Sequence, residues 1–150
     1  MADNHTPEVR SYNMSRIRSK DTKPEIWLRK QLFKRGFRYR KNVKYIPGKP
    51  DLFLRKYNTA IFVNGCFWHR HAGCKYAYTP KSRTEYWNSK FIANVKRDKE
   101  IQNQLTGLGI KWLIIWECTI TKMNRNEEYA DATLKQMVDF LVSDSMNVEL

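Results

Sequence analysis

The sequence predicts one α/β domain that covers residues 1–150. Along the chain, segments whose apolar residues have a helical period are interspersed with segments that have the pattern of strands. No repeat, low-complexity stretch or linker divides the chain, and a chain of this length can bury about two thirds of its unfolded surface in one domain. The predicted order is a helix, three strands, a helix, a strand and a terminal helix.

The N-terminal part predicts two helices. Residues 13–20 are basic and are expected to form a short helix. The segment Thr22-Lys23-Pro24-Glu25 then has the form of a capping box with proline in the first turn. This second helix is expected to end at Gly36, because glycine readily adopts the positive φ that helix ends often need.

Three strands are expected next. Residues 37–43 alternate between the two faces of a strand, and Ile46-Pro47-Gly48-Lys49-Pro50 makes a turn. Residues 51–55 and 59–63 also have strand character. Only three residues separate them, so they are predicted to form an antiparallel hairpin.

Regular periodicity is absent from about residue 65 to residue 80. A long helix is then expected, with Ser82 or Thr84 as its cap and Gly107 or Gly109 at its end.

A buried strand is predicted over residues 111–116, followed by a final helix. Glu127 and Glu128 would complement the dipole at the start of that helix. Its apolar face would consist of Leu134, Met137, Val138 and Leu141.

The charge balance points to a polyanionic partner. The chain has 28 Lys and Arg against 15 Asp and Glu, a net charge of +13, and a pI near 9.8. Such a field favours nucleic acid, although a ribosomal protein would show the same balance. No apolar run approaches a membrane span, and the N-terminus is too polar for a signal peptide, so we expect a cytoplasmic protein.

The densest group of chemically active residues is Cys66-Phe67-Trp68-His69-Arg70-His71-Ala72-Gly73-Cys74. Thiolates and imidazole bind zinc, and Cys66, His71 and Cys74 with the distant Cys118 would complete one tetrahedral site. An odd number of cysteines without an export signal favours metal binding over disulfides. The alternatives are three buried thiols without metal, or a site in which His69 replaces His71.

Three further residues are candidates for catalysis. Asp51 begins a strand after Pro50, where its carboxylate could bind a hard cation, although such residues often only complete a turn. A histidine not used by zinc, His69 in this arrangement, could deprotonate water. Glu25 is explained by helix capping alone.

Aromatic and basic residues suggest contacts with DNA. Phe67 and Trp68 either pack the metal-binding loop or enter a base step as a wedge. The other candidates have equally plausible structural roles in a helix core or on a solvated surface. They are Met14, Ile17, Trp87 and Lys90.

With these motifs the chain resembles the very short patch repair endonucleases over nearly its whole length. The most specific element is Gly-Cys-Phe-Trp-His at residues 65–69, following the Pro-Asp pair at residues 50–51. The matching segments are Asn13-Met14-Ser15-Arg16-Ile17, Pro47-Gly48-Lys49-Pro50-Asp51, Asn64-Gly65-Cys66-Phe67-Trp68-His69, Arg83-Thr84-Glu85-Tyr86-Trp87, Asn94-Val95-Lys96-Arg97-Asp98 and Trp116-Glu117-Cys118.

The resemblance implies a restriction-endonuclease-like core, a mixed β-sheet flanked by helices, with a structural zinc site. Zinc would be held by residues matching Cys66, His71, Cys74 and Cys118. A catalytic Mg²⁺ would be bound by Asp51 and the backbone carbonyl of Val63. His69 would activate the attacking water, and Glu25 would support the water shell of the magnesium ion.

The resemblance also implies how DNA is held. Phe67 and Trp68 would enter a mismatched duplex from the major groove, and Met14 and Ile17, in a DNA-contacting segment 1–20, from the minor groove. Trp87 and Lys90 match positions near the mismatch. Two positions depart from a well-known member: Val63 replaces threonine, and Asn64 replaces a histidine that assists catalysis. A neutral asparagine cannot exchange protons, so an auxiliary catalytic role at Asn64 is not supported.

The function implied is nicking of DNA on the 5′ side of the thymine in a T·G mismatch, such as arises when 5-methylcytosine deaminates. The expected partner is double-stranded DNA, with mismatch-repair proteins as further candidates. The expected enzyme is a bacterial monomer that associates with the nucleoid when bound to DNA. Two alternatives remain: a non-catalytic zinc-dependent DNA-binding module, and a restriction-type nuclease without mismatch preference.

Overall fold

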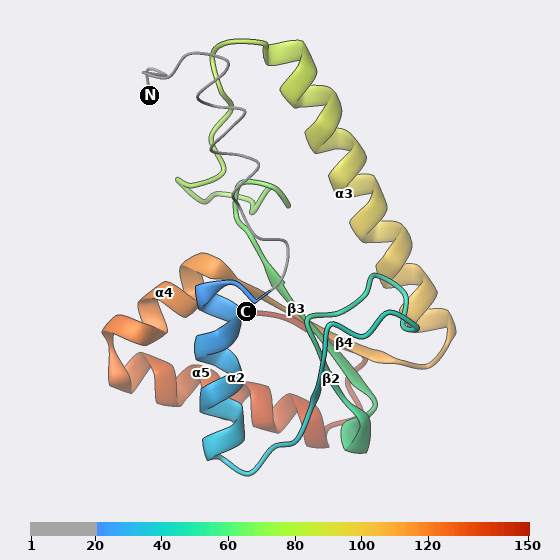
Figure 1. Ribbon diagram of the computed structural model, residues 1–150, viewed down its shortest axis with the longest axis vertical. Helices are drawn as coiled ribbons and strands as arrows, with labels where there is room; N and C mark the ends of the chain where they lie inside the picture. The colour runs from blue at the N-terminus through green and yellow to red at the C-terminus, as the bar shows by residue number, and fades with distance from the viewer. Residues whose placement is uncertain (1–20) are drawn as a thin grey trace.

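The structure, a computed structural model, describes residues 21–150 (Figure 1). The helix expected at residues 13–20, and the DNA contacts expected of Met14 and Ile17, lie outside this range. The described helices are α2 (Lys23–Lys34), α3 (Thr84–Gly107), α4 (Glu117–Arg125) and α5 (Glu127–Val142), with one 3₁₀ turn, η1 (Arg55–Tyr57). The described strands are β1 (Arg40–Lys41), β2 (Leu52–Leu54), β3 (Thr59–Asn64), β4 (Lys111–Trp116) and β5 (Asn147–Glu149).

Within the described range the strands form one mixed sheet in the order β1-β2-β3-β4-β5. The predicted hairpin is confirmed, because β2 pairs antiparallel with β3 through Leu52 and Ile61. β3 then runs parallel to β4 over its whole length, and β4 runs parallel to β5. The carboxyl ends of β3 and β4, at Asn64 and Trp116, therefore meet at one edge of the sheet.

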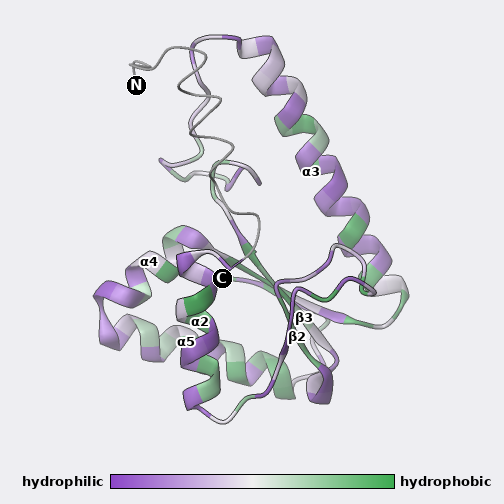
Figure 2. Ribbon diagram, viewed as in Figure 1, coloured by the Kyte–Doolittle hydropathy of each residue, from purple (hydrophilic) through white to green (hydrophobic). Residues whose placement is uncertain are grey.

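Helices cover both faces of this sheet, as expected (Figure 1). Alternate residues of β3 and β4, such as Ile61 and Leu113, join the main core beneath α2, α4 and α5. The intervening residues, such as Ala60, pack toward Leu105 of α3. Figure 2 shows apolar β3 and β4 enclosed by helices with hydrophilic outer sides. None of the helices in residues 21–150 is long and apolar enough to cross a membrane.

The predicted N-terminal cap of α2 is confirmed, but one of its two hydrogen bonds has a different partner from that of a standard capping box. The Thr22 hydroxyl accepts from the Glu25 amide at 3.4 Å, while Glu25 Oε2 accepts from the amide of Asp21 rather than from that of Thr22. Leu28 and Leu32 are fully buried beneath the sheet, whereas Phe33 is half exposed. The cap thus fixes the start of α2, where Glu25 is itself buried.

The predictions for residues 37–43 and for the cap of α3 need correction. Only Arg40 and Lys41 pair with β2. β2 ends at Leu54 and the chain turns into η1, so residues 37 and 38 have no strand to pair with, and on the other side Asn42 adopts a left-handed backbone with φ of 50°. α3 spans nearly the predicted range, but Arg83 holds the cap position and Thr84 is its first residue. The Thr84 hydroxyl donates to the carbonyl of Lys81 instead.

Two elements were missed from the sequence, α4 and β5. α4 has few apolar residues, and it begins directly after β4 without a turn signal. β5 has only three residues, too few for a periodic pattern. α4 matters for the site because it places Glu117 and Cys118 at the carboxyl end of β4.

Gly48 fixes the loop that leads to Asp51 against α3. Its φ is +80°, and a Cβ there would lie 2.5 Å from Cγ2 of Ile101 and 3.0 Å from the Phe62 ring. We expect Gly48→Ala to lower the free energy of unfolding by about 2–4 kcal/mol, from backbone strain and overpacking together. Urea unfolding measures this change.

Gly109→Ala is the matched control, because Gly109 has φ of +72° and no atom within 4 Å of the position its Cβ would take. Only the backbone-strain part of the loss is expected in this control. Equal losses in the two variants would contradict the packing argument.

Candidate active site

A cleft of about 1200 Å³ opens at the edge of the sheet where β3 and β4 end. Its walls come from the start of α2, the loop before β2, the segment after β3 and the first turn of α4. The residues that line it include Glu25, Asp51, Asn64, His69 and Glu117. The fold therefore brings together the three candidate catalytic residues, which are widely separated in the sequence.

Asp51 is held by the neighbouring strand. Its Oδ2 accepts a hydrogen bond of 2.7 Å from the backbone amide of Val63. Burial, and then the negative charge of neighbouring Glu25, raise the pKa of Asp51 to about 7. A buried carboxylate beside a second carboxylate is a set of oxygen donors that suits a hard divalent cation, since the cation would offset their repulsion.

Glu25 and Glu117 complete the acidic wall of the cleft. Glu25 is 4% exposed, so its role in the cap does not remove it from the cleft. Burial and the charge of Glu25 raise the pKa of Glu117. Sequence reasoning did not select Glu117. The parallel pairing of β3 and β4 would have pointed to it, because the carboxyl ends of parallel strands often carry functional groups.

His69 lies apart from the cysteines and contacts Asp98 of α3. Its Nδ1 is 2.7 Å from Oδ2 of Asp98, and its backbone amide donates to the carbonyl of Gly65. A neutral imidazole that donates from Nδ1 to a carboxylate keeps its lone pair on Nε2. Nε2 can therefore accept a proton, and Asp98 would stabilise the resulting imidazolium.

The cysteine and histidine cluster forms as predicted, with His71 rather than His69. One donor atom from each of Cys66, His71, Cys74 and Cys118 lies within 4.8 Å of the others, so the cluster could hold a metal ion. Cys118 Sγ lies 3.4 Å from Nδ1 of His71. Ligands of a tetrahedral zinc site are separated by roughly 3.3–3.8 Å, given Zn–S and Zn–N bonds of about 2.3 and 2.0 Å.

Two further predicted site residues, Val63 and Asn64, lie at the end of β3. Val63 is buried beside Asp51, whose carboxylate its amide contacts. Asn64, also buried, ends the strand and lines the cleft near His69. A backbone carbonyl at Val63 can serve as an oxygen ligand whatever its side chain.

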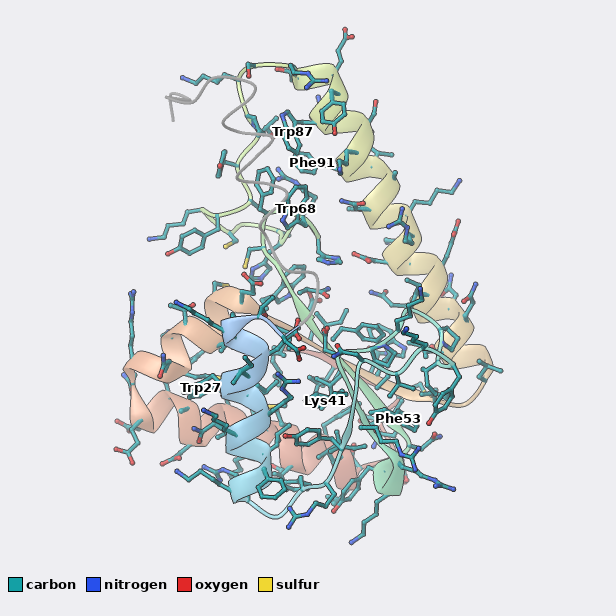
Figure 3. All side chains as sticks on the ribbon, in the orientation of Figure 1. Trp27, Lys41, Phe53, Trp68, Trp87 and Phe91 are labelled. Atoms are coloured by element: carbon teal, nitrogen blue, oxygen red, sulfur yellow. The ribbon has the colours of Figure 1, made fainter. Side chains whose placement is uncertain are left out.

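Phe67 and Trp68 line the cleft. Trp68 lies in a group with Trp87 and Phe91 of α3 (Figure 3). The Phe67 ring centroid is 5.0–5.6 Å from those of Trp68, Tyr78, Trp87 and Phe91. Lys90 Nζ lies 5.5 Å from the centroid of a Trp68 ring. Within residues 21–150, the buried Trp87 Nε1 has no hydrogen-bond partner. The candidate DNA-contacting residues that can be described thus form one group.

One face of α3 organises both the histidine and the aromatic residues. Trp87, Phe91, Asn94 and Asp98 recur at intervals of four, three and four residues, which places them on the same side of a helix. Asn94 donates to the carbonyl of Trp68 at 3.1 Å, and Asp98 holds His69. Asp98 was not selected as a site residue from the sequence, although this spacing could have identified it.

The raised pKa of Asp51 predicts a pH-dependent stability in Mg²⁺-free buffer. The folded-state pKa of about 7 exceeds the ordinary aspartate value of 3.8, so between these values the folded state binds more protons than the unfolded state. The contribution of Asp51 to stability is therefore full below the lower pKa and decreases as pH rises through about 7. We expect Asp51→Asn to gain roughly 1–3 kcal/mol of stability relative to wild type between pH 4.5 and 8. Urea unfolding with zinc retained measures the free energy of unfolding of both proteins. If the difference between Asp51→Asn and wild type is the same at pH 4.5 and pH 8, the prediction is contradicted.

A family model described as DNA mismatch endonuclease Vsr matches residues 2–76. The type II nicking enzyme V.NmeAIP of Neisseria meningitidis serogroup A is 41% identical over 139 residues, which are 93% of this chain and 99% of that protein. The DNA mismatch endonuclease Vsr of Escherichia coli K12 is 37% identical over 139 residues, 93% of this chain and 86% of that protein.

A third relative extends the same comparison. The type II nicking enzyme V.XorIIP of Xanthomonas oryzae pv. oryzae is 37% identical over 139 residues, 93% of this chain and 98% of that protein. All three alignments are long enough to include the cleft, the cysteine and histidine cluster and α3.

Proposed function

Because the chain belongs to the Vsr family of DNA mismatch endonucleases, and is a DNA endonuclease related to mismatch repair, we propose that it nicks DNA on the 5′ side of the thymine in a T·G mismatch. The observation that carries the proposal is that a buried carboxylate, Asp51, and His69 lie on the walls of one cleft, with His69 held by Asp98 behind it. We assign the chain to one domain, residues 1–150, with a restriction-endonuclease-like core. We also propose that it acts as a monomer in the cytoplasm, associated with the nucleoid when bound to DNA.

The proposed mechanism assigns one task to each group. Asp51 and the Val63 carbonyl would hold Mg²⁺, which when bound stabilises negative charge on the attacked phosphate and the leaving oxygen. His69 removes a proton from the attacking water through Nε2, and Asp98 holds the ring in position. Water oxygen bonds to phosphorus as the bond to the 3′ oxygen breaks, leaving a 3′-hydroxyl and a 5′-phosphate. Glu25 hydrogen-bonds to water in the cleft, and Asn64 has no proton-transfer role.

The proposed DNA contacts follow from the aromatic cluster. Phe67 and Trp68 would enter the base stack at the mismatch from the major groove, and Met14 and Ile17 would contact it from the minor groove. Unstacking a base step costs about a few kcal/mol, least where pairing is already weakened. Trp87 and Lys90 would bind close to the mismatch. Mismatch-repair proteins are proposed as further partners.

Zinc is proposed as the metal of the cysteine and histidine cluster, with a structural role because four protein ligands leave no open position. We expect His71→Ala to lose the metal and to lower the unfolding temperature by more than about 10 °C, as loss of a structural zinc removes several kcal/mol. Metal content and thermal unfolding measure both effects. His69→Ala is the matched control and should retain the metal, because His69 lies outside the cluster. Metal retention in His71→Ala would contradict the ligand assignment.

The proposed activity is tested with duplexes labelled separately on each strand. A T·G duplex and its T·A counterpart are incubated with Mg²⁺ or with Mg²⁺-free buffer, and the product ends are identified. We expect a single nick 5′ to the mismatched thymine, only with Mg²⁺ and only in the T·G duplex. Sequence context can be obtained from the same assay by varying the flanking bases.

A second candidate function is a nicking nuclease without mismatch preference. Two of the relatives carry the name type II nicking enzyme, and this observation favours it. Equal cleavage of the T·A and T·G duplexes would support this candidate. Mg²⁺-independent binding without any product would instead indicate a DNA-binding module, a class that the enzyme names of these relatives do not favour.

A further inference from the structure

Arg70 follows the proposed wedge and connects three parts of the molecule. Its Nη1 donates to the carbonyls of Phe67 at 3.2 Å and Tyr78 at 3.0 Å. Its Nη2 donates to the carbonyl of Ala77 at 2.7 Å and to Oγ1 of Thr79 at 3.4 Å. The terminal guanidinium nitrogens therefore hold the start of the loop at Phe67 to its later part at residues 77–79.

The same guanidinium stacks on α3. Its central carbon lies 3.8 Å from the centroid of the Phe91 ring, close enough for a strong cation–π contact. Phe91 in turn contacts Phe67 and Trp87, with ring centroids 5.2 and 5.8 Å apart. Figure 3 shows Trp68, Trp87 and Phe91 grouped between the loop and α3. Arg70 thus fixes the Phe67 backbone from one side and its aromatic neighbour from the other.

Only an arginine can make this set of contacts. A planar guanidinium offers a fixed fork of donors and a face that stacks on a ring, whereas lysine offers one ammonium with three donors. The backbone at Arg70 has φ of 56°, so the side chain is directed by a sharp local turn. The cysteine and histidine cluster fixes the same loop, but through Cys66, His71 and Cys74.

We infer that Arg70 is a positioning residue for mismatch recognition: it orders Phe67 and Trp68 as a wedge before DNA binds. The inference rests on the proposed function, because it assumes that these two rings enter the duplex. A wedge ordered in advance loses little conformational freedom on binding, so more of the stacking energy appears as affinity for the mismatch. Arg70 would then affect the preference for T·G over T·A, and not the general attraction to phosphates.

The test is the ratio of Kd values for T·A and T·G duplexes in Mg²⁺-free buffer, which prevents cleavage. We expect Arg70→Lys to reduce this ratio about tenfold, while the Kd for T·A stays nearly constant because the charge is kept. The matched control is Arg38→Lys. Arg38 also stacks on a ring, at 4.1 Å from Phe33, and donates to a backbone carbonyl, but it lies outside the cleft. An unchanged ratio in Arg70→Lys, or an equal fall in Arg38→Lys, would overturn the inference.

A second comparison separates positioning from direct DNA contact. In a Phe67→Leu background we expect Arg70→Lys to change the ratio much less than in wild type, because Arg70 acts through Phe67. An equal change in both backgrounds would overturn the positioning role. Zinc content and thermal unfolding establish that each variant is folded. If Arg70→Lys does not fold, Arg70→Gln, which keeps a planar amide donor, replaces it with the same expected loss. Wild type without any T·G preference would instead reject the proposed function.

Discussion

Asp51→Ala is expected to abolish nicking, with a fall in rate of at least about 10³-fold, while binding to a T·G duplex stays within roughly threefold of wild type. Loss of the carboxylate removes the side-chain ligand proposed for Mg²⁺, and the charge stabilisation attributed to such an ion amounts to several kcal/mol. Phe67 and Trp68 lie on another segment, and the chain keeps its net positive charge, so the variant should still bind DNA. Single-turnover nicking and Kd values for the same duplex measure the two effects separately.

The stability of this variant distinguishes a loss of catalysis from a loss of folding. Asp51 is buried beside Glu25 and has a pKa of about 7, so in Mg²⁺-free buffer its removal relieves repulsion near neutral pH. We therefore expect an unfolding temperature that is unchanged or higher at pH 8. Asp139→Ala is a control for a general effect of charge, because Asp139 pairs with Lys135 on the exposed side of α5. Normal nicking by Asp51→Ala would remove the basis of the proposed mechanism.

His69→Ala is expected to reduce the nicking rate by about 10²–10⁴-fold, the usual contribution of a general base. Asp98→Asn should have a smaller effect, about 10–100-fold, because the histidine remains but loses the carboxylate that orients it and stabilises its charge. Both variants should keep the metal of the cysteine and histidine cluster and the preference for T·G in binding. Single-turnover rates across pH 5.5–9 measure the effect.

Two further measurements test whether His69 itself activates the water. Added imidazole should restore part of the rate of His69→Ala. It should have little effect on Asp98→Asn, in which the histidine itself is still present. A rate in His69→Ala within threefold of wild type would show that another group activates water.

Much of the fold was predictable because local signals agreed with tertiary packing. The Thr22 cap, the hairpin between β2 and β3 and the apolar strand β4 each have a distinct pattern over a few residues. α4 and β5 were missed because both are short and depend on pairing or packing with distant segments. The strand expected at residues 37–43 is shortened because its partner β2 ends at Leu54 and because Asn42 is left-handed, and no hydrophobic period reveals either feature.

The candidate site divides in the same way. The sequence alone determined which chemical groups are available: four zinc-type ligands, a carboxylate after a proline and a free histidine. It left open whether His69 or His71 joins the cysteines, and it did not indicate Asp98 or Glu117. The structure assigns His71 to the cluster and His69 to Asp98.

Only the tertiary structure decided these pairings, because a side chain's partner depends on how segments far apart in sequence are packed. Parallel pairing of β3 with β4 brings Glu117 and Cys118 to the end of the strand that leads to Asn64. The face of α3 that bears Trp87, Phe91, Asn94 and Asp98 then covers the loop after β3. Residue types and spacing thus determine what chemistry this chain contains, while strand order and helix packing determine which groups act together.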